Sequence, residues 1–234
     1  MIACLFPPRC PVCGEVRIPW ESSTCADCAG RLMFINEPVC MRCGRELSDE
    51  TKEYCDRCEK SPMSYIRNCA VWRYDRWMKK SIADFKYSGK KEYAGFYIQN
   101  MAKRYGSQLL RYGVTVLVPV PVSVKRKRYR GFNQAELLAE GLAGELGIVS
   151  ANLLKRVRHT QPQSGLSPAE RKKNLSGAFA WNQRAADGLQ NLPAAVAVVD
   201  DIFTTGSTME ACTKELQRNG IRNVYGICIC IGSE

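Results

Sequence analysis

Eight of the thirteen cysteines in this chain of 234 residues form four CxxC pairs, and eleven residues separate each pair from the next. The pairs are Cys10/Cys13, Cys25/Cys28, Cys40/Cys43 and Cys55/Cys58. A CxxC turn directs two sulfur atoms at one metal ion, and two such turns complete a tetrahedral four-sulfur site for zinc. Disulfides or redox dithiols are the alternative interpretation, but structural disulfides are rare in intracellular proteins. We therefore expect about two zinc ions, both structural, because four thiolates leave no open position on the metal.

The equal gaps do not by themselves show which pairs share a metal. A glycine follows the first and third pairs (Gly14 and Gly44) but not the second and fourth, so the pattern CxxCG-x(10)-CxxC occurs twice with a period of 30 residues. This repeat favours two sequential ribbons, a first ribbon (residues 10–28) and a second ribbon (residues 40–58), over an interleaved arrangement. Four further cysteines stand in apolar surroundings and are expected in the core: Cys69, Cys212, Cys228 and Cys230.

A second group of residues capable of chemistry follows an apolar run near the end of the chain. Its sequence is Val198-Val199-Asp200-Asp201-Ile202-Phe203-Thr204-Thr205-Gly206-Ser207-Thr208. A strand that leads through two acids into a hydroxyl-rich turn and then a helix favours an anion, because backbone amides and the helix dipole converge on such a turn. The two acids suit sugar hydroxyls beside a phosphate. The alternative is an N-capped helix preceded by two surface acids.

The positive charge of the chain is concentrated in its middle. Of the 34 Lys and Arg residues, 21 fall in residues 71–173 against 7 acids, whereas the flanking parts are nearly balanced. A localised basic field indicates a polyanionic partner, either the phosphates of a small ligand or nucleic acid; a solvated surface is the alternative. The densest basic cluster is Lys125, Arg126, Lys127, Arg128 and Arg130.

Aromatic residues stand among the basic ones, as in Trp72-Arg73-Tyr74-Asp75-Arg76-Trp77 and around Tyr129 and Phe132. Phosphate neutralisation combined with base stacking is typical of sequence-tolerant binding of single-stranded nucleic acid. For Trp72 and Tyr74, which alternate on a predicted strand, ordinary core packing is the alternative.

Apolar β-branched runs alternate with amphipathic segments after the cysteine-rich part. Such alternation indicates an α/β fold with an open, mostly parallel sheet and helices on both faces. The predicted strands are 69–74, 114–122, 194–199 and 223–231, the predicted helices are 77–87, 93–110, 133–146 and 207–218, and 160–174 is a predicted loop. We expect a cysteine-rich module over 1–62 and a second domain over 63–234. The chain has no apolar run of membrane-spanning length and its first residues make a poor signal peptide, so we expect a cytoplasmic location.

Segment 198–208 closely resembles the phosphoribosyl pyrophosphate signature of type I phosphoribosyltransferases, and the whole chain resembles the ComF family of competence-associated proteins. The matching pieces are the CxxC repeats, Phe85-Lys86-Tyr87-Ser88-Gly89, Val118-Pro119-Val120-Pro121, Arg130-Gly131-Phe132-Asn133-Gln134, the stretch from Gln163 through Glu170-Arg171 to Asn174-Leu175, and the signature itself. The resemblance implies a type I phosphoribosyltransferase-like fold behind a double zinc ribbon.

The resemblance also implies roles for individual residues. Asp200 and Asp201 would hold the ribose 2- and 3-hydroxyls. The 5-phosphate would lie on Thr204, Thr205, Gly206, Ser207 and Thr208. The loop after Pro121, with Lys125, Arg126, Arg128 and Arg130, corresponds in order to the pyrophosphate loop, and Arg171 belongs to a segment that takes the place of a mobile lid. Magnesium would bridge ligand oxygens.

In function, the resemblance implies handling of incoming single-stranded DNA in natural transformation, with a phosphoribosyl pyrophosphate-like small molecule as sensed or gating ligand and other DNA-uptake proteins as partners. One alternative is an active phosphoribosyltransferase that moves phosphoribose to a base or another acceptor. Another is a regulatory binder that does not react its ligand. No segment is recognisable as a base-selecting hood, and a shared fold does not establish catalysis.

Overall fold

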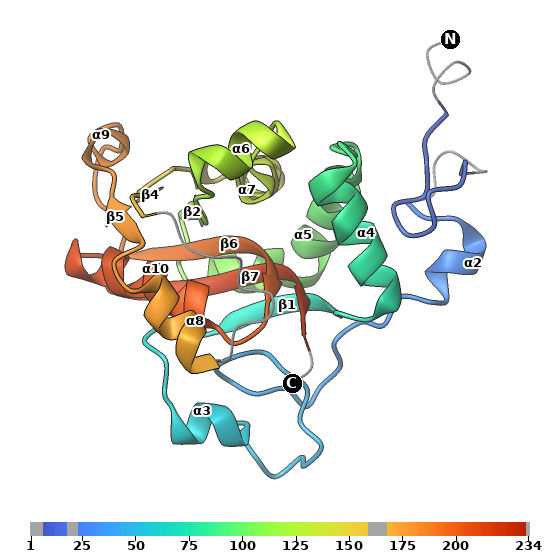
Figure 1. The fold of residues 1–234 in the computed structure, drawn as a ribbon. Helices are drawn as coiled ribbons and strands as arrows, with labels where there is room; N and C mark the ends of the chain where they lie inside the picture. Colours follow the sequence, from blue (N-terminus) through green and yellow to red (C-terminus); the bar gives the residue numbers. More distant parts are fainter. Residues whose placement is uncertain (1–6, 18–22, 159–167, 233–234) are drawn as a thin grey trace.

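Five strands form the central sheet of the computed structural model, which describes residues 7–17, 23–158 and 168–232 (Figure 1). Their order is β1-β7-β6-β2-β3, and all neighbours run parallel. Two more strands, β4 and β5, form a separate antiparallel pair. The strands are β1 (Asn68–Arg73), β2 (Val116–Pro119), β3 (Val149–Ser150), β4 (Leu154–Arg156), β5 (Phe179–Trp181), β6 (Ala195–Phe203) and β7 (Asn223–Ile231).

Helices cover both faces of this sheet, as the sequence predicts. Helices α4, α5 and α7 pack on one face, and α10, α8 and the β4–β5 pair pack on the other (Figure 1). Within the described residues the helices are α2 (Ala26–Ala29), α3 (Asp56–Lys60), α4 (Arg76–Tyr87), α5 (Tyr93–Arg111), α6 (Val124–Arg130), α7 (Gln134–Leu146), α8 (Pro168–Leu175), α9 (Gln183–Ala186) and α10 (Ser207–Arg218). None of them is long and apolar enough to span a bilayer.

Side-chain caps set where two of the predicted helices begin. The carboxylate of Asp75 accepts hydrogen bonds from the amides of Trp77 and Met78, so α4 begins at the next residue. Asn133 caps α7 in the same way through the amide of Ala135. The helix starts predicted at 77 and 133 from the amphipathic pattern lie within one residue of those observed.

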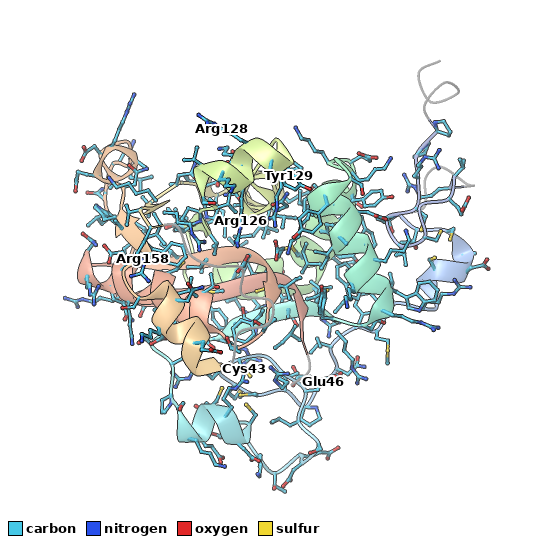
Figure 2. The ribbon with its side chains drawn as sticks, in the orientation of Figure 1. Cys43, Glu46, Arg126, Arg128, Tyr129 and Arg158 are labelled. Carbon is cyan, nitrogen blue, oxygen red and sulfur yellow. The ribbon has the colours of Figure 1, made fainter. Side chains whose placement is uncertain are left out.

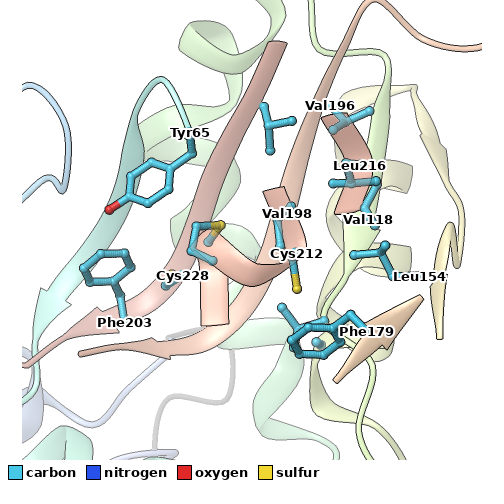
Figure 3. Packing of buried hydrophobic residues seen from close by; sticks show 14 of the residues in the cluster. Tyr65, Val118, Leu154, Phe179, Val196, Val198, Phe203, Cys212, Leu216 and Cys228 are labelled. Carbon is cyan, nitrogen blue, oxygen red and sulfur yellow. The ribbon is translucent and has the colours of Figure 1, made fainter. Parts of the chain in front are cut away.

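Alternate side chains of β6 divide the interior into two cores. Val196 and Val198 pack against α10 and the β4–β5 pair, and Figure 3 shows them beside Cys212 and Leu216. Ala197 and Val199 pack on the opposite face with α4, α5 and α7. The four cysteines predicted for the core (Cys69, Cys212, Cys228 and Cys230) are all buried.

Two strand predictions need correction at their ends. Strand β6 continues to Phe203, past the predicted end at residue 199, because Asp200 and Ile202 still pair with β7. Strand β2 is shorter than the predicted 114–122. Its last ladder bond runs from the amide of Val120 to the carbonyl of Val199, and Pro121 has no amide to continue the ladder.

The basic segment after β2 is a helix rather than the loop that the family resemblance implies. The hydroxyl of Ser123 accepts from the amide of Arg126 to start α6, and Gly131 ends it in the left-handed conformation at φ +78°. The predicted loop 160–174 is also wrong in its second part, where α8 runs from Pro168 to Leu175; residues 160–167 lie outside the described chain. Lys, Arg and Glu are good helix formers, and proline is favoured in the first turn.

The cysteines form two clusters that follow the predicted sequential pairing. Cys10, Cys13, Cys25 and Cys28 make one, Cys40, Cys43, Cys55 and Cys58 the other, and within each cluster all four sulfurs lie within 4.8 Å of one another. The sulfur–sulfur distances of 3.8 Å (Cys13–Cys25) and 3.7 Å (Cys43–Cys55) match the edge of about 3.8 Å that a tetrahedron with zinc–sulfur bonds of about 2.3 Å requires. The clusters therefore fit two structural zinc ions.

The two ribbons share one backbone design. In each, the glycine after the first pair has a positive φ and donates its amide to the carbonyl of the first cysteine, at 2.8 Å for Gly14 and 2.9 Å for Gly44. Their surroundings differ. The first cluster forms a small satellite core with Val12 beside α4, whereas Cys40, Cys43 and Cys58 belong to the same core as β6 and α10.

This difference predicts that loss of metal from the second cluster lowers the free energy of unfolding more than loss of metal from the first cluster. The purified chain should hold about two zinc ions, and Cys10→Ser and Cys40→Ser should each release one. Cys40→Ser should lower the free energy of unfolding of the whole chain by at least about 3 kcal/mol, because its cluster is part of the main core, whereas Cys10→Ser should change it by less than about 1 kcal/mol. Metal analysis and chemical denaturation measure both quantities.

If metal analysis of the freshly purified protein found no zinc, the metal assignment would be contradicted. Equal destabilisation by the two substitutions would contradict the distinction between the ribbons. A cooperative transition retained by residues 63–234 alone is what the predicted division after residue 62 requires.

Candidate functional site

The carboxyl ends of the parallel strands meet in a cleft of about 540 Å³. Strand β6 brings the two acids and leads into turn 204–208, which ends in α10; β2 leads through Val120 and Pro121 into α6; β7 contributes Cys228. A crevice beyond the carboxyl ends of parallel strands is where ligands bind in open α/β sheets. The cleft therefore lies where the fold favours a ligand.

Most of the residues singled out in the sequence line this cleft together. They are Asp200, Asp201, Thr204, Gly206, Ser207, Thr208, Arg126 and Arg130. Thr205 instead borders a second cavity of about 430 Å³ on the other side of the turn. Arg171 lies on α8, but its side chain is outside the described part of the chain.

Asp201 forms an ion pair with Lys86, the second last residue of α4, at 2.7 Å. Both side chains are largely buried, with 14% of Lys86 and 15% of Asp201 exposed. Burial and the ammonium group together keep the Asp201 carboxylate in one orientation at the cleft wall. Lys86 lies in a segment that the family resemblance already includes, but sequence spacing gives no signal that it contacts an acid 115 residues away.

Asp200 is in a different electrostatic position. Burial raises the pKa of its carboxyl group to about 7, and the neighbouring charge of Asp201 adds to the increase. Arg156 at the end of β4 acts in the opposite direction on this pKa, as does Lys86. Arg156 also lines the cleft and stacks on Phe179, with 5.4 Å between the guanidinium carbon and the ring centroid. Sequence reasoning missed Arg156 because β4 is only three residues long.

The backbone conformation of turn 204–208 requires a glycine, and Gly206 supplies it. Gly206 has φ +77°, and a Cβ atom at this position would lie 2.9 Å from the ring of Phe203 and 3.1 Å from the hydroxyl oxygen of Tyr65. The hydroxyls of Thr205 and Ser207 are 2.8 Å apart, which ties the turn to the start of α10. With 12 residues, α10 has a full dipole whose positive end meets the turn.

Helix α6 has two basic sides. Arg126, Tyr129 and Arg130 line the cleft. Lys125, Lys127 and Arg128 are exposed, and in Figure 2 the label of Arg128 lies on the outer side of α6 and that of Arg126 on the side nearer the sheet. Lys127 is held by Glu136 at 2.7 Å, whereas Lys125 and Arg128 make no ion pair with any described residue.

Arg130 is fixed by its neighbours. It donates to the amide oxygen of Gln134 at 2.9 Å and to the hydroxyl of Tyr87 at 3.1 Å, and its guanidinium also lies over the Tyr87 ring. Arg126 lines the same cleft, and no hydrogen bond of this kind joins its guanidinium group to another described residue.

The aromatic residues near the basic segments divide between core and surface. Trp72 is fully buried and stacks on Phe96, which confirms ordinary core packing for it, and Phe132 is also buried. Tyr129 is 78% exposed and stands among the cations of α6. Only Tyr129 of these three therefore has a ring face that a base could reach.

The raised pKa of Asp200 predicts a pH-dependent stability. Because the folded chain holds this proton more tightly than the unfolded chain between about pH 4 and pH 7, the free energy of unfolding should fall as pH rises through that window. Asp200→Asn should flatten the fall and stabilise the protein at pH 8 by on the order of 1 kcal/mol or more. Urea denaturation from pH 5 to pH 8 tests this, with Asp187→Asn on the exposed end of α9 as control. A parallel pH profile for Asp200→Asn and the unsubstituted protein would contradict it.

Comparison with known proteins agrees with both parts of the chain. Residues 1–59 match the family described as double zinc ribbon domain. Competence protein F of Haemophilus influenzae is 30% identical over 92% of this chain and 93% of its own length. The DNA utilization protein YhgH of Salmonella typhimurium is 30% identical over 94% of this chain and 96% of its own length, and competence protein ComFC of Bacillus subtilis is 26% identical over 86% and 80%. On this similarity along nearly its whole length, the chain belongs to the ComF family of competence proteins.

Proposed function

We propose that the protein handles incoming single-stranded DNA in the cytoplasm during natural transformation, and that a phosphoribosyl pyrophosphate–magnesium complex in the cleft gates this handling. The observation that carries the proposal is the cleft itself, in which two acids, a turn suited to an anion and three arginines border about 540 Å³ beside a helix with exposed cations. The relatives' names, competence protein and DNA utilization protein, support a DNA-related role.

The order of groups along β6 suits a phosphorylated ribose. Asp200 and Asp201 can accept hydrogen bonds from adjacent sugar hydroxyls, and turn 204–208 follows at once with hydroxyl donors and the amides of the first turn of α10. Lys86 pairs with Asp201, which offsets the negative charge of that carboxylate beside an anionic ligand.

The cationic side of the cleft suits the pyrophosphate. Arg126 and Arg130 come from α6, and Arg156 from β4. Arginine forks match phosphate oxygens in a bidentate way. Magnesium would join ligand oxygens to one or two carboxylates and keep several waters, as it does with other phosphate ligands.

The exposed side of α6 suits a nucleic-acid strand. Lys125 and Arg128 present charge that no ion pair with a described residue offsets, and Tyr129 presents a ring that can stack on a base. Helix α6 carries both the residues that line the cleft and the exposed residues that would meet DNA. A ligand that orders the helix through Arg126 therefore changes the surface that DNA meets. Coupling of this kind is reciprocal, so DNA must alter the affinity for the small ligand by the same factor.

Binding of the small ligand is tested by thermal stability. Phosphoribosyl pyrophosphate with magnesium should raise the melting temperature, because a ligand that binds only the native state stabilises it by mass action. Asp201→Asn and Thr205→Val should abolish the shift while the proteins stay folded, and Asp187→Asn should leave it intact. An unchanged shift in both site variants would place the ligand elsewhere.

Binding of DNA is tested by substitutions on the two sides of α6. Replacing Lys125 and Arg128 together by Gln should weaken the binding of single-stranded DNA. The slope of the logarithm of the binding constant against the logarithm of salt concentration should become shallower by about 1.4, since each lost phosphate contact removes roughly 0.7. The affinity for the small ligand should not change. Arg126→Gln should weaken the small ligand. A matched control removes the same charge from α5, with Lys103→Gln and Arg111→Gln.

The same titration separates the proposal from its enzymatic alternative. DNA affinity should change when the sugar pyrophosphate and magnesium are added, without release of pyrophosphate. DNA binding that is absent at low salt, or indifferent to the α6 variants and to the ligand, would contradict the proposal and favour a phosphoribosyltransferase.

A further inference from the structure

Two arginines of the second ribbon hold the first carbonyl of turn 204–208. Arg45 donates to the carbonyl oxygen of Thr204 from Nη2 at 3.2 Å, and Arg57 donates to the same oxygen from Nη1 at 3.4 Å. Arg45 also donates to the carbonyl of Gly232, whose amide in turn donates to Phe203 at 2.8 Å. The end of β6 and the residues after β7 are thereby joined to one guanidinium group.

Both arginines belong to the metal-binding knuckles. Arg45 follows Cys43 and Gly44, and its own carbonyl accepts from the amide of Cys40 at 2.7 Å. Arg57 stands between Cys55 and Cys58 on α3. A metal that gathers the four sulfurs of the second cluster would therefore also fix the backbone at both arginines.

The first ribbon carries acids at the equivalent positions. With the period of 30 residues, Glu15 corresponds to Arg45 and Asp27 corresponds to Arg57. The first ribbon instead contacts α4, where Lys80 donates to the carbonyl of Cys13 at 3.3 Å and Arg31 lies over the ring of Trp77. The repeat thus keeps the metal ligands the same and changes the two residues that reach the turn.

The turn depends on contacts at its two ends. Thr205 and Ser207 border the cavity of about 430 Å³, which Arg57 also lines, so this side of the turn is not filled by packed side chains. In a trans peptide the carbonyl and the following amide point in opposite directions. Holding the carbonyl of Thr204 toward the second ribbon therefore turns the amide of Thr205 away from the ribbon.

We propose that Arg45 and Arg57 are positioning residues that set turn 204–208 for a phosphate, and that phosphate binding there depends on the metal in the second cluster but not in the first. The inference rests on the proposed function, because it concerns the group that the turn would bind. It adds a role for the second ribbon beyond structural support.

Calorimetric titration of the full-length, zinc-loaded protein with ribose 5-phosphate tests the inference. Arg45→Ala with Arg57→Ala should raise the Kd by about tenfold, as expected for loss of hydrogen bonds from charged donors, while the zinc content stays unchanged. The Kd for inorganic pyrophosphate with magnesium should stay within about twofold, because that ligand meets α6. Arg31→Ala in the first ribbon is the matched control and should change neither Kd.

Lysine substitution distinguishes position from charge. Arg45→Lys keeps the positive charge but loses the fork that reaches two carbonyls, so it should weaken ribose 5-phosphate as much as Arg45→Ala. Full recovery of affinity with lysine would overturn the inference, because attraction by charge alone would then explain the effect.

The metal gives an independent measurement. Ribose 5-phosphate should raise the zinc affinity of the second cluster, measured by competition with a chelator, and leave the zinc affinity of the first cluster unchanged, since coupling between two binding events is reciprocal. Cys10→Ser, which keeps only the second cluster, identifies the affinity that changes. Unchanged ribose 5-phosphate affinity in the arginine variants would overturn the inference and leave the proposed function standing, whereas failure of the unsubstituted protein to bind ribose 5-phosphate would overturn both.

Discussion

The parallel pairing of β6 with both β2 and β7 is the constraint on which the rest of the structure depends. Parallel neighbours end at the same edge of a sheet, so whatever follows each strand must gather there. The acids of β6, the turn before α10 and the basic helix after β2 come together for this reason, although about 70 residues separate α6 from the acids. The apolar side chains of the two cores bury both faces of the sheet beneath helices, which leaves the strand ends as the place for a ligand.

Two copies of one metal-binding pattern serve different neighbours. The knuckle geometry is the same in both ribbons and follows from cysteine spacing and a glycine with positive φ. The two ribbons differ at a few positions between the cysteine ligands, where the second ribbon has arginines and makes buried contacts. Asn68, the first residue of β1, is fully buried and donates to the carbonyl of Cys43, which anchors the second ribbon directly to the sheet. Figure 2 shows Cys43 and Glu46 below the sheet, on the side away from α6.

The parts of the fold that sequence patterns predict are those with strong local signals. The amphipathic segments indicate helices α4, α5, α7 and α10, and the CxxCG repeat indicates the pairing of the clusters. Helices α6 and α8 lack an apolar stripe because their side chains are mainly charged, so periodicity gives no indication of them. The contact between Lys86 and Asp201 joins two elements that only the sheet order brings together. The assignment of the second domain's ligand and the division after residue 62 stay predictions.

The stretch between the two ribbons has a consequence for solubility. Strand β1 lies at one end of the sheet, and an edge strand with free amides and carbonyls is a template for pairing with other chains. Ile35 donates to Val71 at 3.0 Å and Met33 accepts from Arg73 at 2.9 Å, with an antiparallel bridge between Phe34 and Trp72. The segment between Cys28 and Cys40 therefore also covers the outer edge of β1, so that other chains cannot pair with this strand. The length of this segment must suit both the distance between the two metal sites and the coverage of β1. An insertion or deletion here that preserves one of them would therefore disturb the other.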